Sequence, residues 1–320
     1  MGGRSVLLIK PGSMGDVIHA LPVASAIRQA WPEAELTWVV DPRWAPLLSG
    51  NPAVSAVRHF PREDFRGAGG WSCAFRWYAG LRGLKPDVVV DLQGLLRSAL
   101  MAKCSGGKSI LGLGDAREGA RLFYGQSAAT VSDEHAVRRY LRVLPLLGID
   151  VPEMCDFPLP AGERPQLAER FVVLHPFARG AGKSLGAEAI RAFVSEFKAR
   201  SSACLVIVGR GEAPTGIPDG VVDLCGKTSL DGLIGLLRAA RFVVSVDSGP
   251  MHLAAALGVP MLGIHTWSDP RLVGPYREDA WIWQGGEIRK QDLSLAPLPE
   301  KAFSAESAAE VARFVAGQAG

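Results

Sequence analysis

Short apolar runs alternate with helix-like stretches along the whole chain. The apolar runs cover residues 5–9, 36–40, 55–60 and 88–91, and then 171–175, 204–209, 242–246 and 261–265. Apolar positions at helical spacing fill 16–31, 93–103, 135–147, 187–200, 230–240 and 305–316. Pro22 is expected to kink or restart the first of these helices. Two blocks of repeated strand–helix units predict an α/β fold with two parallel sheets covered by helices.

A proline-rich stretch with little periodicity separates the two blocks. Residues 151–166 contain four prolines and little periodicity, which is typical of an interdomain linker. We therefore expect a first domain over 1–155, a linker over 156–165 and a second domain over 166–304. The two sheets are expected to face each other across a cleft, with ligands beyond the carboxyl ends of the strands.

Composition narrows the class of protein. The 320 residues are 48% hydrophobic and 21% charged, and a net charge of +3 is too small to indicate nucleic-acid binding by itself. The five cysteines lie far apart, with no C-x-x-C pair and no zinc spacing, which predicts reduced thiols in a cytoplasmic protein. No signal peptide or spanning segment is expected, so any membrane contact should be peripheral.

The stretch 243–259 carries the strongest chemical signal. It reads V-V-S-V-D-S-G-P-M-H-L-A-A-A-L-G-V, a buried strand that feeds a helix through a tight turn. Asp247 and Ser248 can cap that helix, and the backbone N–H groups around Gly249 favour an anion. His252 projects from the first helical turn. The stretch predicts either a site for a phosphorylated ligand or a well-capped strand–helix unit with a satisfied histidine.

A second candidate follows the first strand directly. Residues 10–19 read K-P-G-S-M-G-D-V-I-H, in which Gly12 and Gly15 permit a tight loop and close approach of a ligand. Asp16 lies at the helix start, facing the predicted cleft, either as a functional carboxylate or only as a helix cap. The spacing fits neither a Walker A motif nor G-x-G-x-x-G, so it indicates neither an NTPase nor a dehydrogenase.

Two strand ends in the second half carry a cation and a carboxylate. Residues 175–183, H-P-F-A-R-G-A-G-K, offer backbone donors and the mobile charge of Lys183, which suits a diphosphate but also a solvated surface loop. Glu212, after two glycines, can accept hydrogen bonds from ribose hydroxyls or lie on the surface. No D-x-D sequence occurs, so the usual carboxylate pair for a metal-bound diphosphate is missing.

A basic and aromatic segment spans residues 58–85. Six cations stand there against only two acids, Glu63 and Asp64. The cations are Arg58, Arg62, Arg66, Arg76, Arg82 and Lys85, and the interleaved aromatic residues are Trp71, Phe75, Trp77 and Tyr78. The segment is either a contact surface for an acidic partner or a solvated loop.

Several motifs, spread over nearly the whole chain, carry a family resemblance. They are K-P-G-S-M-G-D-V-I-H-A-L-P at 10–22, D-L-Q-G-L-L-R-S-A at 91–99, D-A-R-E at 115–118, L-F-Y at 122–124, H-A-V-R-R at 135–139, D-S-G-P-M-H-L-A-A-A-L-G at 247–258 and S-D-P at 268–270. On these motifs the chain resembles the ADP-heptose:lipopolysaccharide heptosyltransferase family, most closely its type I branch.

The resemblance implies a GT-B fold with two Rossmann-like domains and a last helix, 305–318, that packs back on the first domain. It implies transfer of L-glycero-D-manno-heptose from ADP-heptose to a Kdo sugar of Kdo2-lipid A, inverting the anomeric centre without a metal or other cofactor. An acceptor of this kind places the protein peripherally on the cytoplasmic face of the inner membrane.

The same resemblance assigns roles to the candidate residues. Asp16 would be the general base that removes the proton of the acceptor hydroxyl. The donor would be held by Lys183, Glu212, Asp247, Ser248, Gly249 and His252. The acceptor would be held by Ser13, Met14, Gly15, Arg62, Arg66, Arg76 and Arg117. The aromatic residues of the basic segment would dip toward the acyl chains.

The chain departs from the family's pattern at two places beside the expected donor site. Phe177 and Ala178 replace hydroxyl residues, with extra glycines before Lys183, and H-T-W-S-D-P at 265–270 stands where the family reads G-P-T-D-P. Two other functions stay open on the sequence. One is a GT-B transferase that uses another nucleotide sugar, and the other is a nucleotide-sugar or lipid A binding protein without turnover.

Overall fold

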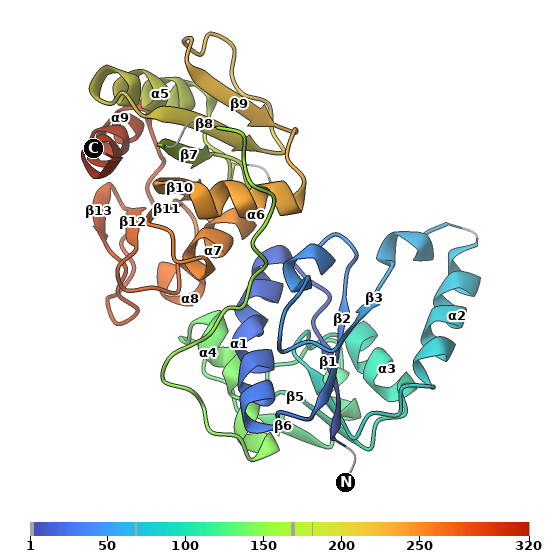
Figure 1. Cartoon of the computed structure of the whole chain (residues 1–320). Coiled ribbons are helices and arrows are strands. Elements are labelled where there is room, and N and C mark those ends of the chain that lie inside the picture. The colour runs from blue at the N-terminus through green and yellow to red at the C-terminus, as the bar shows by residue number, and fades with distance from the viewer. Residues whose placement is uncertain (1–2, 68, 168–169, 181, 320) are drawn as a thin grey trace. The chain divides into compact units, whose positions relative to one another are not determined.

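The chain folds into two compact α/β units, residues 1–160 and 161–320, each with its own sheet (Figure 1). The computed structural model describes residues 3–67, 69–167, 170–180 and 182–319. Each unit is described by itself below.

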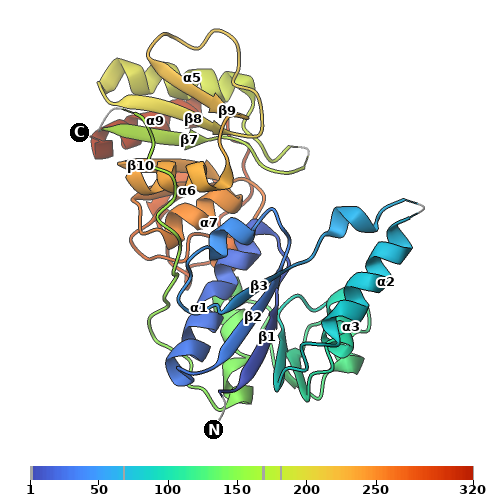
Figure 2. The same ribbon diagram turned by 45° about the vertical axis from the view of Figure 1, so that its right-hand side comes forward.

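The first unit has a six-stranded parallel sheet in the order β3-β2-β1-β4-β5-β6. Its strands are β1 (Ser5–Ile9), β2 (Glu35–Val40), β3 (Ala56–His59), β4 (Val88–Asp91), β5 (Ser109–Leu113) and β6 (Gln126–Ala128). Its helices are α1 (Met14–Ala30), α2 (Gly70–Leu81), α3 (Leu96–Cys104) and α4 (Ala136–Leu141), with the 3-10 turns η1 (Ala45–Leu48), η2 (Arg62–Phe65), η3 (Ala120–Phe123) and η4 (Leu144–Leu147). Figure 2 shows α1 on one face of the sheet and α2 with α3 on the other. The chain runs outward from β1 through β2 to β3, and then crosses by α2 to β4 on the other side of β1.

Two helices of this unit differ from the sequence-based expectation. Pro22 does not restart the first helix, because α1 runs without a break from Met14 to Ala30. Nearly all of α1 up to Ile27 is buried, so packing offsets the one hydrogen bond that a proline removes. The helix expected over 135–147 is shorter: α4 ends at Leu141 and η4 follows, with Pro145 in its first turn.

The second unit has a seven-stranded sheet in the order β13-β12-β11-β10-β7-β8-β9, in which β13 pairs antiparallel with β12. Its strands are β7 (Phe171–His175), β8 (Cys204–Gly209), β9 (Val221–Cys225), β10 (Phe242–Val246), β11 (Met261–His265), β12 (Trp281–Gln284) and β13 (Glu287–Lys290). Its helices are α5 (Ala187–Arg200), α6 (Leu230–Ala239), α7 (Gly249–Ala256), α8 (Pro270–Val273) and α9 (Ala305–Ala319). The parallel register aligns the carboxyl ends of β7, β10 and β11.

The C-terminal helix packs on the second unit, so the expectation that helix 305–318 packs back on the first domain is wrong. Val311 and Val315 of α9 share one buried core with Phe193 and Phe197 of α5, and Figure 1 shows the two helices side by side. Alanine and valine on the inner stripe of α9 let the helix approach the phenylalanines of α5 closely.

Candidate functional site

The loop after β1 places Asp16 at the start of α1. Gly12, in this loop, has a φ of +155°, and a Cβ there would lie 2.8 Å from the indole nitrogen of Trp44. A side chain is therefore excluded at Gly12 by both backbone conformation and space. Ser13 precedes the helix, and Asp16 occupies its third position, from which a carboxylate reaches back to the backbone N–H of the capping residue.

The Asp16 carboxylate is surrounded by four donors, two on each oxygen. Its Oδ1 accepts a 2.6 Å hydrogen bond from the Tyr140 hydroxyl and lies 3.2 Å from the Lys10 ammonium. Its Oδ2 accepts from the backbone N–H and from the hydroxyl of Ser13, each at 2.8 Å. A carboxylate offers about four lone-pair positions. The described donors therefore occupy all of them, although 37% of the side chain is exposed.

The same network fixes the charge of Asp16. Burial raises its pKa, but the Lys10 ammonium and the hydrogen bonds from Tyr140 and Ser13 outweigh burial and lower the pKa well below its usual value. Burial lowers the pKa of Lys10, which Asp16 partly offsets, and burial beside Asp16 raises the pKa of Tyr140. Asp16 is therefore an ionised carboxylate that remains accessible.

A second carboxylate lies at the end of the neighbouring strand. Asp91 pairs with Ile9 in the register of β4 against β1, and it is 0% exposed. It accepts hydrogen bonds from the Tyr124 hydroxyl at 2.7 Å and from the Ser98 hydroxyl at 2.8 Å. Burial raises its pKa despite these donors. Asp91 holds the strand end together and is closed to a substrate, so Asp16 is the accessible carboxylate of the pair.

The structure brings together some of the predicted acceptor residues. Met14 and Gly15 form the first turn of α1 with Asp16. The four predicted arginines, Arg62, Arg66, Arg76 and Arg117, are all exposed.

Two of these arginines have informative neighbours. Arg66 pairs with Glu63 at 2.7 Å. Burial lowers the pKa of Arg97, and the nearby charge of Arg62 lowers it further. Like charges gathered in this way favour an anion.

In the second unit, the candidate donor residues gather where β7, β10 and β11 end. The His175 ring nitrogen Nδ1 lies 3.2 Å from the Ser245 hydroxyl and 3.3 Å from the Ser248 hydroxyl. Nε2 of His252 lies 3.8 Å from Asp247 Oδ1, and both residues are buried. Gly249 begins α7, whose first N–H groups point out of the helix.

His265, Lys183 and Glu212 follow or end strands of the same sheet. Burial lowers the pKa of His175 and of His265 to about 4, so both are neutral imidazoles at neutral pH. The ammonium of Lys183 lies 3.3 Å from the centre of the Trp267 ring. Glu212 is exposed. Ala181, in the same loop as Lys183, lies outside the described residues.

Sequence reasoning missed the residues that hold Asp16 and the buried histidines. Lys10 stood inside a quoted motif without a role, although a lysine directly after a buried strand is an unusual position. Tyr140 gave no signal, since it lies 124 residues from Asp16. His175 and His265 end strands of the sheet, and a polar residue closing a buried run is the signal that could have found them.

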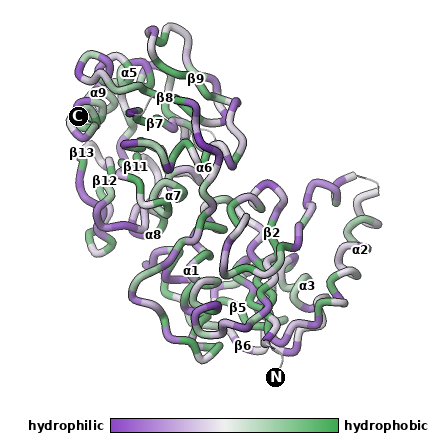
Figure 3. Tube along the Cα trace, viewed as in Figure 1, coloured by the Kyte–Doolittle hydropathy of each residue, from purple (hydrophilic) through white to green (hydrophobic). Residues whose placement is uncertain are grey.

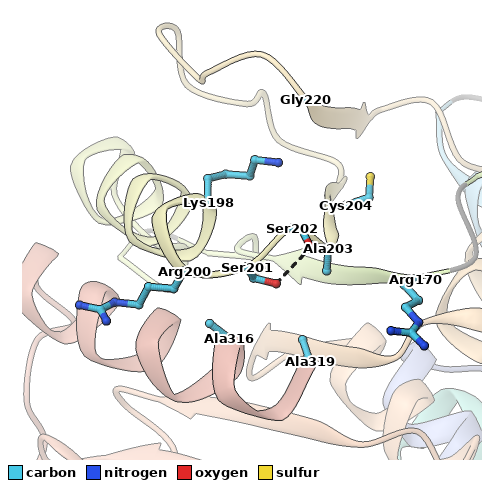
Figure 4. Close-up of a pocket in the computed structure, with 10 residues that line it drawn as sticks. All are labelled: Arg170, Lys198, Arg200, Ser201, Ser202, Ala203, Cys204, Gly220, Ala316 and Ala319. Carbon is cyan, nitrogen blue, oxygen red and sulfur yellow. Dashed lines mark hydrogen bonds between the residues drawn. The ribbon is translucent and has the colours of Figure 1, made fainter.

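A basic pocket lies at the opposite edge of the second sheet (Figure 4). Arg170 stands directly before β7, Ala203 stands before β8, and Lys198 and Arg200 come from the end of α5. These are the amino ends of the strands, so the pocket is separate from the region around His175. Among the described residues there is no group of three His, Cys, Asp or Glu side chains that could hold a metal ion.

Fold and site together define a class of protein. Two Rossmann-like, largely parallel sheets, a helix start that suits a phosphate and an accessible ionised carboxylate fit a glycosyltransferase of the GT-B fold. The profile of glycosyltransferase family 9 (heptosyltransferase) matches residues 75–295. The chain belongs to this family and is a glycosyltransferase, which confirms the predicted fold class and enzyme class.

Individual relatives agree over nearly the full length. The chain is 30% identical to lipopolysaccharide heptosyltransferase 1 of Escherichia coli K12, over 93% of this chain and 99% of that protein. It is 30% identical to the Pseudomonas aeruginosa protein of the same name, over 85% of this chain and 81% of that protein. The solved structure of E. coli heptosyltransferase WaaC with ADP superposes with a TM-score of 0.81 at 28% identity, covering 99% of this chain and 100% of that one. WaaC has also been solved with ADP-2-deoxy-2-fluoro heptose.

Proposed function

We propose that this glycosyltransferase moves L-glycero-D-manno-heptose from ADP-heptose to a Kdo sugar of Kdo2-lipid A, in the synthesis of the lipopolysaccharide inner core. The reaction inverts the anomeric centre and uses no metal. The observation that carries the proposal is the Asp16 carboxylate, held ionised and accessible at the start of α1. The names and ligands of the relatives support the donor and the acceptor.

Asp16 acts as the general base. The acceptor oxygen attacks the anomeric carbon from the face opposite the diphosphate, and the bond from that carbon to the diphosphate oxygen breaks. The electron pair leaves on ADP, and the proton of the alcohol passes to Asp16. A carboxylate with a lowered pKa is a weak base, so it takes the proton late, when the sugar has become oxocarbenium-like and the alcohol acidic.

The alcohol must replace one of the four donors around Asp16. The Lys10 ammonium and the Tyr140 hydroxyl are buried, and the backbone N–H of Ser13 is fixed by the helix start. The Ser13 hydroxyl is exposed and turns about a single bond. We infer that it gives up its place on Oδ2 to the acceptor hydroxyl.

The leaving ADP is stabilised in the second unit. The N–H groups at the start of α7 and the ammonium of Lys183 meet the growing negative charge on the diphosphate. His252, buried beside Asp247, adds a donor from the first turn of α7, and Glu212 accepts from the ribose hydroxyls.

The membrane surface is the second proposed partner, with contact on the cytoplasmic face of the inner membrane. Trp71 and Phe75 are 85% and 76% exposed and lie on one side of α2, four residues apart. Figure 3 shows α2 in white and green along most of its length. Leu122, on η3, is 89% exposed in the same layer, since both α2 and η3 pack on α3. Among the described residues, no helix has the length and apolar character that crossing a membrane requires.

Charge fits this contact to an anionic lipid. Arg76 lies on α2, Arg66 precedes it, and both are exposed. Aromatic side chains flanked by cations bind the interface of anionic bilayers through buried apolar area and through attraction to headgroups. The arginines of this layer also suit the phosphates and carboxylates of the acceptor.

Mass spectrometry of the product tests the transfer. With ADP-heptose and Kdo2-lipid A the acceptor should gain the mass of one heptose, with or without a chelator. Parallel reactions with ADP-mannose and UDP-sugars test the donor. Gain of a different sugar would replace ADP-heptose as the donor, and binding of Kdo2-lipid A without release of ADP would show a binding protein.

Vesicle sedimentation tests the membrane contact. The double variant Trp71→Ser, Phe75→Ser should sediment roughly tenfold less with vesicles containing phosphatidylglycerol, because two interfacial anchors are lost. The matched control is Met154→Ser, which changes another residue of the first unit that is 88% exposed. Equal sedimentation of all three proteins would disprove this surface as the membrane contact.

A further inference from the structure

The two loops that depart from the family's pattern touch each other where Lys183 meets Trp267. Lys183 lies in the loop between β7 and α5, and Trp267 lies in the loop between β11 and α8. The Lys183 ammonium is 3.3 Å from the centre of the Trp267 ring. This is well inside the range of about 6 Å in which a cation is attracted to an aromatic face.

The contact lies beside the carboxyl end of β10. In the strand order β11-β10-β7, the central strand is β10, and its carboxyl end leads into Asp247, Ser248 and α7. Loops from the strands on either side therefore meet beside the carboxyl end of β10. The contact therefore joins loops that leave the same end of the sheet as the start of α7, which suits a phosphate.

The tryptophan side of the contact is the better anchored one. His265, two residues before Trp267, is buried, and its Nδ1 lies 3.0 Å from the Ser268 hydroxyl. Gln284 donates to the Ser268 carbonyl at 3.4 Å. Trp267 itself is 40% exposed, so one part of the ring is held and another faces solvent.

The lysine side has a different construction. Gly180 and Gly182, just before Lys183, have φ values of +104° and +74°, and Gly182 has open space where a Cβ would lie. The chain here can take conformations that other residues avoid. A ring on an anchored loop thus holds a lysine that directly follows a glycine with a positive φ.

We propose that Trp267 is a positioning residue for the donor diphosphate, acting through Lys183. The ring restricts the Lys183 side chain before the ligand arrives, so that less conformational freedom is lost when its ammonium meets the phosphates. This inference rests on the proposed function in one respect, namely that the anion is the diphosphate of a nucleotide sugar.

A double-mutant cycle on ADP affinity, measured by calorimetry, tests the proposal. Trp267→Leu should weaken ADP binding roughly threefold to tenfold, and Trp267→Phe should restore most of the affinity, because a phenyl ring still attracts a cation. In a Lys183→Met background, Trp267→Leu should have no further effect. The control is Lys290→Met, which removes a cation that lies 4.1 Å from the Trp281 ring elsewhere in the second unit, and it should leave the affinity unchanged.

The outcomes separate this proposal from the function on which it rests. If Trp267→Leu weakens binding equally with and without Lys183, or not at all, the positioning role is disproved while the donor site stands. If the protein does not bind ADP, the same double-mutant cycle is measured on its affinity for inorganic pyrophosphate. Coupling seen only with pyrophosphate would support the positioning role and overturn the nucleotide donor, and binding of neither ligand would overturn both.

Discussion

The carboxylate site of the first unit and the strand ends of the second unit differ in how far the protein itself supplies partners for their charged side chains. Asp16 is surrounded by four donors from its own unit, two of them from the buried residues Lys10 and Tyr140. In the second unit, Lys183 rests on an aromatic ring and Glu212 is exposed. A general base must be ionised before any substrate arrives. A cation that binds a diphosphate can instead gain its anionic partner when the ligand binds.

The largest effect on turnover should come from replacing the Asp16 carboxylate. Asp16→Asn keeps the shape of the side chain but cannot take a proton, so turnover should fall by about 10²- to 10⁴-fold. Affinity for ADP should stay within about twofold, because the proposed donor residues all belong to the other unit. Coupled release of ADP and calorimetry measure the two quantities.

The control for this variant is Asp150→Asn, which changes an exposed carboxylate of the same unit. Full turnover by Asp16→Asn would remove Asp16 as the base. A large loss of ADP affinity would instead show that the two sites are not independent, and would break the comparison.

A ligand should order the second site far more than the first. At a concentration of ADP of 100 Kd, openings that exclude the ligand become about 100-fold rarer, which corresponds to about 2.7 kcal/mol. Amide hydrogen exchange should therefore slow in peptides covering 171–186 and 247–257, and should stay unchanged over 13–30. Equal protection of both regions would show that the first site is also completed by ADP.

The comparison also explains how much could be predicted. Strands β7 and β10 were predicted to the residue, because each apolar run ends at a polar group, His175 or Asp247. Helix α2 was not predicted, since glycine begins it and its aromatic and basic residues indicated a surface loop. Asp16 was found from its motif, but its buried partner Tyr140 lies in α4, 124 residues along the chain, and only the packing of α4 against α1 brings the two together.

Removing the Tyr140 hydroxyl should shift the charge of Asp16. Tyr140→Phe takes away the 2.6 Å donor to Oδ1, so the ionised form is less stabilised and the pKa of Asp16 rises. Activity is lost as the pH falls through that pKa, so the acid limb of the kcat/KM profile should move to higher pH by about one unit.

The same variant should be less stable than the parent. Because the lowered pKa of Asp16 stabilises the fold above the unfolded pKa of about 4, the variant should lose about 1 kcal/mol of unfolding free energy at neutral pH, and less in acid. Tyr124→Phe is the matched control, since it removes a 2.7 Å hydroxyl donor from the buried Asp91 and should leave the acid limb in place. An equal shift in both variants would mean that the limb does not report Asp16.

The smallest effect should come from the exposed donor. Ser13→Ala removes the hydroxyl on Oδ2 and keeps the backbone N–H, so the pKa of Asp16 should rise by less than in Tyr140→Phe. Because the acceptor alcohol then finds that position empty, kcat/KM for Kdo2-lipid A should hold or increase about twofold above the acid limb, and Ser13→Thr should behave as the parent. A tenfold fall in Ser13→Ala would mean that this hydroxyl contacts the acceptor directly instead of yielding its place. The Asp16 site would then also gain a partner from its substrate. The two units would differ only in how deeply their donors are buried.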